Sequence, residues 1–326
     1  MVRIEIDEAR CSGCNFCVEF CPTSVFDRVK GGQKDVAKAN RSEECWACMA
    51  CVGQCPEWAI TITQDNPPKR YVDDENEKAF VPLDVKEIET YAGYSQALER
   101  VLTLRSKPVA VTLIPRGEPL PHVPVPRIRL RYCQSLIIAR RGKSILMPPH
   151  SHSCADGTSI LGLTKIPVRL TTGDVYLKLG KLASREAAER LVRERPALPE
   201  ESVRATLVTP LAKAVMKPDI IVIMAPPESM MWLCMASTFY TGRRMTFKMS
   251  SYNAQCVETT VYPLESGEIN MSLGCYGCRT VSELGEDIMF MGIPVAKMPS
   301  LIDGLEHLGK KAIPDSRSKL YLPPLI

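Results

Sequence analysis

Eight cysteines near the start of the chain have the spacing that iron–sulfur chemistry requires. They form two runs, "CSGCNFCVEFCP" at 11–22 and "CWACMACVGQCP" at 45–56, and each run reads C-x2-C-x2-C-x3-C-P. Two-residue gaps let a loop wrap three thiolates around one face of a 4Fe–4S cubane, while backbone N–H groups point at the sulfides. The fourth cysteine is set back by three residues and turns away from that loop, and the proline after it fixes φ as the chain leaves.

The two runs resemble those of the bacterial-type two-cluster ferredoxins. The resemblance covers residues 1 to about 65 and rests on all eight cysteines and both prolines. In these ferredoxins the fourth cysteine of each run ligates the other cluster. The resemblance therefore implies two 4Fe–4S clusters with ligands exchanged between the runs. One ligand set is Cys11, Cys14, Cys17 and Cys55, and the other is Cys45, Cys48, Cys51 and Cys21.

Zinc is the alternative metal for so many thiols, because it also takes four thiolates in C-x2-C pairs. Zinc motifs usually show two separated pairs, whereas each run here is a compact set of four with a trailing proline, so we expect iron–sulfur clusters. Fourteen cysteines would indicate disulfides only in a secreted protein. The first residues carry acidic side chains, and no apolar stretch approaches the ~18 residues that cross a bilayer. We therefore expect a cytoplasmic, metal-binding protein.

The sequence around the runs predicts a small duplicated domain at residues 1–65. Residues 2–6 and 59–63 are β-branched and alternate, so they read as two strands that pair the domain's ends. Residues 25–29 and 35–40 read as a hairpin. The expected fold is a ferredoxin-like duplicated ββ/αβ iron–sulfur domain. The net charge of the whole chain is only +4, and no basic stripe is interleaved with aromatics, so we expect no nucleic-acid binding.

A linker at 66–93 and a larger mixed α+β domain at 94–326 are expected to follow. The sequence from Asp65 is polar and proline-bearing, which is typical of a linker. Apolar runs predict buried strands and 3.6-residue periodicity predicts helices. The expected strands are 107–115, 144–148, 167–170, 219–225, 245–249 and 258–264. The expected helices are 83–104, 184–195, 227–240 and 300–311. Because several strands are joined by short turns, we favour α+β over a doubly wound sheet.

The larger domain carries further thiols without compact spacing, except for one pair. Cys275 and Cys278 form a C-x-x-C that could act as a redox-active dithiol, and they are the candidate catalytic residues. With Cys133, Cys154 and Cys256 they could instead hold a third metal centre, or all five could be inert buried residues. Their wide separation along the chain favours about eight irons in the protein, as expected for two cubanes.

Two polar patterns accompany these thiols. His150, His152 and Cys154 would face the same way in a strand and could be ligands, but an exposed loop is the simpler interpretation. Arg127, Arg129 and Arg131 would likewise share a strand face, which could bind an anionic substrate or form a solvated basic surface.

Residues Tyr94 to Leu308 resemble the domain of unknown function 169 family, which is found widely in anaerobic archaea and bacteria. The resemblance rests on the "PVAV" strand, Cys133-Gln134 with Arg140, Cys154 with Gly157, the "TPLAKA" and "KPDIIV" pair, the Cys256 segment and the final "GCYGCR". It implies a fold and an anaerobic host, and no reaction. An acidic residue is expected in the family where this chain has Cys278.

These features predict an iron–sulfur electron-transfer protein of anaerobic metabolism. Electrons would pass singly through two 4Fe–4S clusters to a C-terminal domain that binds a substrate or a further, unknown cofactor. The protein would then be a ferredoxin-type oxidoreductase, as a reductase or a reductase subunit, with a redox partner protein and a small-molecule substrate. The alternatives are a non-catalytic docking partner of a larger oxidoreductase, and a redox sensor or metal-handling protein.

Overall fold

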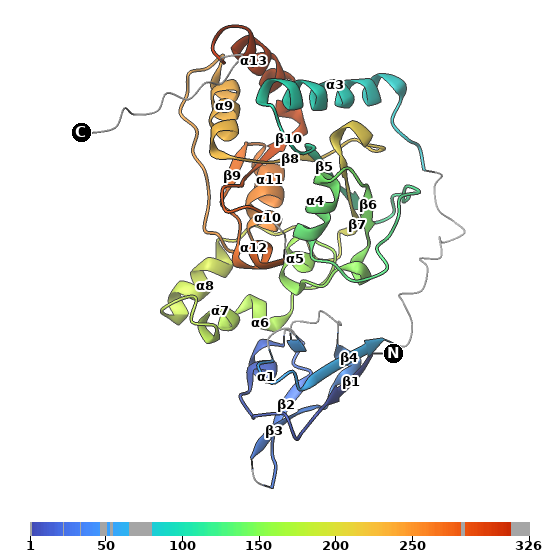
Figure 1. Cartoon of the computed structure of the whole chain (residues 1–326), viewed down its shortest axis with the longest axis vertical. Helices are drawn as coiled ribbons and strands as arrows, with labels where there is room; N and C mark the ends of the chain where they lie inside the picture. The colour runs from blue at the N-terminus through green and yellow to red at the C-terminus, as the bar shows by residue number, and fades with distance from the viewer. Residues whose placement is uncertain are drawn as a thin grey trace, which may run out of the picture.

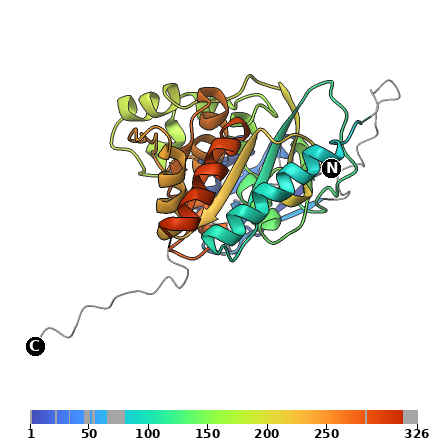
Figure 2. The ribbon, with the colours of Figure 1, turned by 90° about the horizontal axis from the view of Figure 1, so that it is seen from above.

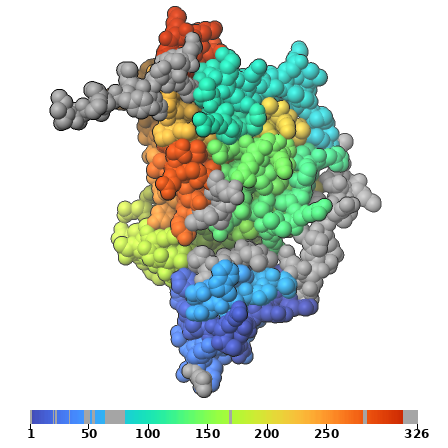
Figure 3. Space-filling view, in the orientation of Figure 1, coloured from blue at the N-terminus to red at the C-terminus, as the bar shows by residue number. Residues whose placement is uncertain are grey.

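The chain forms a small N-terminal domain and a larger C-terminal domain. The computed structural model describes residues 2–21, 23–32, 34–45, 51–52, 55–64, 80–281 and 284–313. The N-terminal domain ends with the strand that reaches residue 64, and it forms a separate lobe at one end of the molecule (Figures 1 and 3). Residues 66–79 of the predicted linker lie outside the described residues.

The N-terminal domain is built from two antiparallel strand pairs. Strand β1 (Val2–Ile6) pairs with β4 (Ile60–Gln64), with Ile4 opposite Ile62, and this confirms the predicted pairing of the domain's ends. Strands β2 (Phe26–Lys30) and β3 (Asp35–Ala39) form the predicted hairpin. A short helix, α1 (Phe16–Phe20), and a 3-10 turn at Ser42–Glu44 complete the described part.

A six-stranded sheet forms the centre of the C-terminal domain. All its pairings are antiparallel, in the order β6-β7-β5-β8-β10-β9, so the expected α+β class is confirmed and a doubly wound sheet is absent from the described residues. The strands are β5 (Val109–Pro115), β6 (Ile145–Met147), β7 (Val203–Pro210), β8 (Ile220–Ala225), β9 (Asn270–Ser272) and β10 (Met289–Pro294).

Helices cover both faces of this sheet, because its central strands are apolar on both sides. Along β8, Val222 and Met224 pack into one core, while Ile221 and Ile223 pack into the other. Three helices lie side by side on the second face (Figure 2): α3 (Val85–Leu102), α9 (Pro227–Thr238) and α13 (Met298–Lys311). Helix α3 begins inside the segment that was predicted as linker, so this part of 66–93 packs with the C-terminal domain.

The first face carries shorter helices and the thiols. These helices are α4 (Tyr132–Arg140), α5 (Ala155–Ile160), α10 (Ala254–Cys256), a π-helix (Val257–Val261), α11 (Tyr262–Ser266) and α12 (Tyr276–Val281). Helices α6 (Val168–Thr171), α7 (Asp174–Lys178) and α8 (Arg185–Arg193) extend beyond the sheet, and α7 contacts α1 of the N-terminal domain. Further 3-10 turns span Pro149–Ser151, Leu211–Lys213 and Val295–Lys297.

Three predicted strands are wrong. Residues 167–170 enter α6, residues 245–249 run without regular pairing, and residues 258–264 form the π-helix and α11. The last segment is rich in β-branched residues, yet Thr259 and Thr260 bond the carbonyl oxygen of Gln255 through their hydroxyls, which supports a helical backbone there. Within the described ranges, no helix is both long and apolar enough to cross a membrane.

Candidate redox centres

Four cysteines of the N-terminal domain line one cavity. They are Cys11, Cys14 and Cys17 of the first run and Cys55 of the second. Apolar side chains, among them Ile6 and Ile60, complete the lining. Burial, followed by the neighbouring thiols of Cys11 and Cys14, raises the pKa of Cys17 to about 11. This donor set suits a cubane, which would stabilise the crowded thiolates with its own positive iron.

The cross-ligation remains a prediction, and the shared cavity supports it. Of the other ligand set, Cys21, Cys45 and Cys51 pack around the domain's core, while Cys48 lies outside the described residues.

The two runs match one another in detail beyond their cysteines. The backbone N–H of Val25 donates to Sγ of Cys21 at 3.4 Å, and that of Ala59 donates to Sγ of Cys55 at 3.3 Å. Both donors lie four residues after the fourth cysteine of their run. The residues just before them, Ser24 and Trp58, both have positive φ, 56° and 52°. The internal duplication therefore includes an N–H···S bond to the fourth cysteine of each run.

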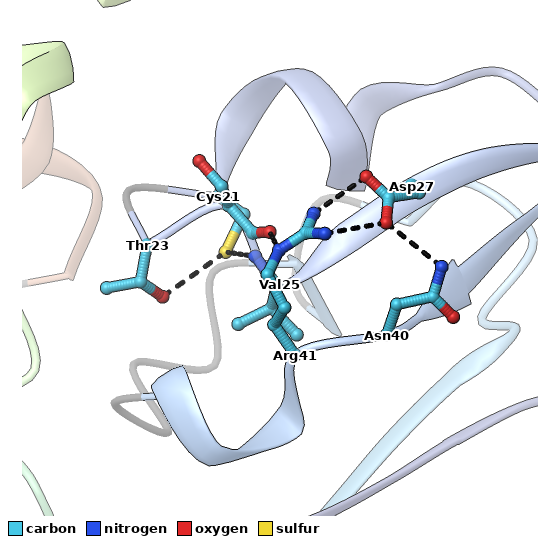
Figure 4. A network of polar contacts seen from close by, with 7 residues as sticks. Cys21, Thr23, Val25, Asp27, Asn40 and Arg41 are labelled. Atoms are coloured by element: carbon cyan, nitrogen blue, oxygen red, sulfur yellow. Dashed lines mark hydrogen bonds and ion pairs between the residues drawn. The ribbon is translucent and has the colours of Figure 1, made fainter.

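Arg41 fixes the loop that follows Cys21. Its Nε donates to the carbonyl oxygen of Ser24 at 2.6 Å, and its two terminal nitrogens donate to the carboxylate of Asp27 at 2.7 and 2.8 Å (Figure 4). Asn40 adds a third donor to the same carboxylate at 2.9 Å. The hydrogen bonds from Arg41 lower the pKa of Asp27. This bidentate pair holds the Cys21 loop against the β2–β3 hairpin.

Five thiols that are far apart in sequence gather on the first face of the C-terminal sheet. This thiol cluster comprises Cys133 in the first turn of α4, Cys154 before α5, Cys256 at the end of α10, Cys275 before α12 and Cys278 within α12. Four of them belong to or pack against one apolar core. The wide sequence separation is therefore not a separation in space.

Short contacts show how closely these thiols approach. A Cβ atom built on Gly157 would lie 3.0 Å from Sγ of Cys256 and 3.7 Å from Sγ of Cys154, so both sulfurs face this glycine. The N–H of Gly157 donates to Sγ of Cys154 at 3.5 Å. A side chain at position 157 would displace one of the two sulfurs.

Four of the thiols interact with one another in every combination. Burial first, and then the neighbouring thiols, raises the pKa of Cys133 to about 12 and that of Cys256 well above its ordinary value. Burial, followed by the Asp156 carboxylate and more weakly by Cys275, raises the pKa of Cys154 to about 12. Cys275 acts on all three of them. The four therefore form one mutually close set, with Cys278 beside Cys275.

The C-x-x-C pair is asymmetric. A hydrogen bond from Cys278 lowers the pKa of Cys275, while sharing that hydrogen bond raises the pKa of Cys278. The N–H of Cys275 donates to Sγ of Cys278 at 3.1 Å, and the Cys278 thiol donates to the carbonyl oxygen of Cys275 at 3.1 Å. Cys278 is 1% exposed. Cys275 is therefore the thiol of the pair that ionises at lower pH, and the buried Cys278 keeps its proton to higher pH.

No three Cys, His, Asp or Glu side chains in the described part of the chain are spaced to hold a single metal ion.

Comparison with known proteins identifies both domains. The model of a 4Fe-4S dicluster domain matches residues 4–62, and the model of the DUF169 family, described as uncharacterised ArCR, matches residues 97–304. The chain belongs to the DUF169 family. Its N-terminal domain is of the ferredoxin type and carries two 4Fe–4S clusters, which makes electron transfer its chemistry.

Individual relatives match one domain or the other. An uncharacterized protein of Methanocaldococcus jannaschii, MJ0308, is 28% identical over 228 residues, which are 69% of this chain and 96% of that protein. A ferredoxin of Methanothermococcus thermolithotrophicus is 40% identical over 63 residues, 19% of this chain and 98% of its own. An uncharacterized ferredoxin of M. jannaschii, MJ0722, is 34% identical over 77 residues, which are 23% of this chain and 92% of that protein. No solved structure matches.

A hydrogen-bond network braces the thiol cluster of the DUF169 domain from the side of α7. The hydroxyl of Tyr176 bonds Asp156 at 3.0 Å and Asn253 at 2.9 Å, and Asn253 Nδ2 donates to Asp156 at 2.8 Å. Asp156 and Asn253 belong to the segments that carry Cys154 and Cys256. The network therefore joins both thiol-bearing segments to the helix that contacts the N-terminal domain. The sequence alone did not predict this network. Its only signal there is that Asp156 and Asn253 lie within three residues of a cysteine.

Two buried polar groups brace the cluster from the opposite side. The hydroxyls of Tyr132 and Thr260 bond at 2.9 Å, which ties the start of α4 to the π-helix that follows Cys256. Glu258 in that π-helix is 2% exposed and accepts from the N–H groups of Ser250 and Ser251 at 2.6 and 2.7 Å. Single π-turns of this kind are frequent at functional sites.

The polar patterns predicted beside the thiols are not brought together as expected. His150 lies in a 3-10 turn, and His152 is buried with Nε2 3.1 Å from the carbonyl oxygen of Met147. Burial lowers the pKa of His152 to about 4, so its ring is neutral near pH 7. The segment of the three arginines is not a strand. Arg131 alone approaches the cluster, where its guanidinium donates to the carbonyl oxygen of Gly277 at 3.4 Å.

The asymmetry of the C-x-x-C pair predicts a reactivity order. In reduced chain stripped of iron, we expect iodoacetamide to alkylate Cys275 faster than Cys133, Cys154 or Cys256 at neutral pH. The reason is that its thiolate persists to lower pH, where burial keeps the other three protonated. Alkylation against pH is followed by peptide mass spectrometry. In C278A the Cys275 profile should move to higher pH, because the hydrogen-bond donor is gone, and an unmoved profile would contradict the assignment.

Proposed function

We propose that the chain is a reductase component in which electrons pass from the N-terminal domain to the thiol cluster of the DUF169 domain. The observation that carries the proposal is the gathering of five thiols at the end of the DUF169 domain that faces the N-terminal domain, where Figure 1 draws α5 and α12. The two 4Fe–4S clusters supply one-electron transfer. Cys275 and Cys278 are the residues we assign to the use of those electrons.

Packing between the domains supports this direction of transfer. Helix α1, which carries Cys17, contacts α7, and α7 carries Tyr176. Tyr176 in turn bonds Asp156 and Asn253 beside the thiols. This chain of contacts connects the N-terminal domain to the segments that carry Cys154 and Cys256.

The chemical setting follows from the thiols. We propose that the protein works in the reducing cytoplasm of an anaerobic cell, where free thiols and iron–sulfur clusters persist. A redox partner protein would deliver the electrons, and a small molecule would receive them at the DUF169 domain. In the alternative, a docking module of a larger oxidoreductase or a redox sensor, the thiol cluster takes up no electrons.

An anaerobic reductive titration separates these functions. The N-terminal domain should take up about two electrons, one for each cubane. We expect the full chain to take up more, and the C275S/C278S variant to return to about two. A Cys275–Cys278 disulfide would add two electrons and two protons to yield two thiols, about four electrons in all. About two electrons in the unaltered chain would contradict the proposal and favour a docking module.

A further inference from the structure

We propose that Cys133, Cys154, Cys256 and Cys275 hold a third iron–sulfur cluster, a 4Fe–4S cubane within the DUF169 domain. The inference rests on the proposed function and deepens it by naming the redox centre to which the N-terminal domain delivers electrons. It replaces the expectation of about eight irons, which depended on sequence separation alone.

The four thiols come from four different segments that the fold brings together. The sulfurs of Cys154 and Cys256 both face Gly157, at 3.7 and 3.0 Å from a Cβ built there. Arg131, two residues before Cys133, donates to the carbonyl oxygen of Gly277, two residues after Cys275. The backbone N–H of Ala254, two residues before Cys256, is hydrogen-bonded to the Cys275 thiol. Four thiols gathered from separate segments are a ligand set that a 4Fe–4S cubane takes.

Backbone N–H groups donate hydrogen bonds to the sulfurs of two of these cysteines, Cys275 and Cys154. The backbone N–H groups of Ala254, Gly277 and Cys278 point at Sγ of Cys275, and that of Gly157 points at Sγ of Cys154. Iron–sulfur sites are stabilised by such N–H···S bonds, which offset the negative charge of the cluster and its thiolates. The ferredoxin ligands have the same donors. If these cysteines served only as apolar core residues, their sulfurs would not require N–H donors.

One buried polar side chain beside the thiols lacks hydrogen-bond partners, and one cation lies close to them. Gln255, directly before Cys256, is 2% exposed, and neither its amide nitrogen nor its amide oxygen has a partner among the described residues. A buried amide costs free energy unless it is hydrogen-bonded. Arg131 brings a positive charge to the same place, within 3.0 Å of a Cβ built on Gly277. A cubane with four thiolates is an anion, so it would be offset by this guanidinium.

Cys278 is left out of the ligand set because its sulfur is already engaged. It exchanges two hydrogen bonds with the backbone of Cys275 and lies in the apolar core. We therefore expect C278S to retain the third cluster.

Iron and acid-labile sulfide per chain test the proposal. The unaltered chain, purified anaerobically and reconstituted with iron and sulfide, should hold about twelve irons, four for each cubane. The C154S/C256S variant should hold about eight. The matched control is C234S, because Cys234 is a partly buried thiol of α9 on the opposite face of the sheet. It should keep about twelve.

About eight irons in the unaltered chain would overturn the third cluster, and this count decides even if the double variant fails to fold. One zinc per chain would overturn it as well. If the chain holds about eight irons and takes up about four electrons, the third cluster is wrong but the proposed function is retained, with a dithiol as the redox centre. If it holds about eight irons and takes up about two electrons, both the third cluster and the proposed function are wrong.

Discussion

Removal of iron from the isolated N-terminal domain is expected to abolish its fold. Residues 1–68, produced with iron and sulfide, should be compact and brown, and chelation should leave a chain without regular secondary structure. The reason lies in the domain's small core, in which Cys11, Cys17 and Cys51 are themselves buried members beside Val25 and Phe26. A domain of this size buries too little apolar surface to be stable alone, so metal binding and folding are one event.

Far-UV circular dichroism before and after anaerobic chelation measures this effect. Restoring iron and sulfide should restore the spectrum, which separates reversible unfolding from damage. A native-like spectrum of the iron-free segment would contradict the dependence on metal.

Loss of the fourth cysteine of the first run is expected to destroy the second cluster. In C21A the cluster held by Cys45, Cys48 and Cys51 should be lost, while the cluster held by Cys11, Cys14 and Cys17 should remain. The reason is the exchange of ligands between the runs, which the cavity shared by Cys55 with the first run supports. The effect should be about four irons, a whole cubane.

The matched control for C21A is C55A, which should show the reverse pattern. Site-resolved EPR or paramagnetic NMR identifies the surviving cluster in each variant. The opposite order of loss would refute the cross-ligation, and equal loss from both clusters would show that the domain fails as a whole.

The sequence predicted the N-terminal domain well because its information is local. Each run carries its cysteines within twelve residues, and strands such as β1 alternate between half-buried and exposed positions. The α+β class of the C-terminal domain was also predicted. Its details were harder, because buried apolar runs have no periodicity that separates strands from helices. Residues 258–264, which read as a strand, show this limit.

The thiol cluster could not be predicted from spacing. Its members come from four segments that the sheet and the helices on its first face bring together, and only the C-x-x-C pair has a local signature. The network of Tyr176, Asp156 and Asn253 depends on the same tertiary packing. His150, His152 and Cys154 would share a face only in a strand, and His150 lies in a 3-10 turn instead. The favoured interpretation, an exposed loop, is wrong for His152, which is buried.

The EPR spectrum of the fully reduced chain tests the central claim most directly, since a redox centre in the DUF169 domain must lie within magnetic reach of the clusters that serve it. We predict a third paramagnetic signal whose spin coupling broadens the spectrum beyond that of the isolated N-terminal domain. C154S/C256S should lose both the signal and the broadening, and C234S should keep them. A spectrum of the unaltered chain identical to that of the N-terminal domain alone would contradict the claim.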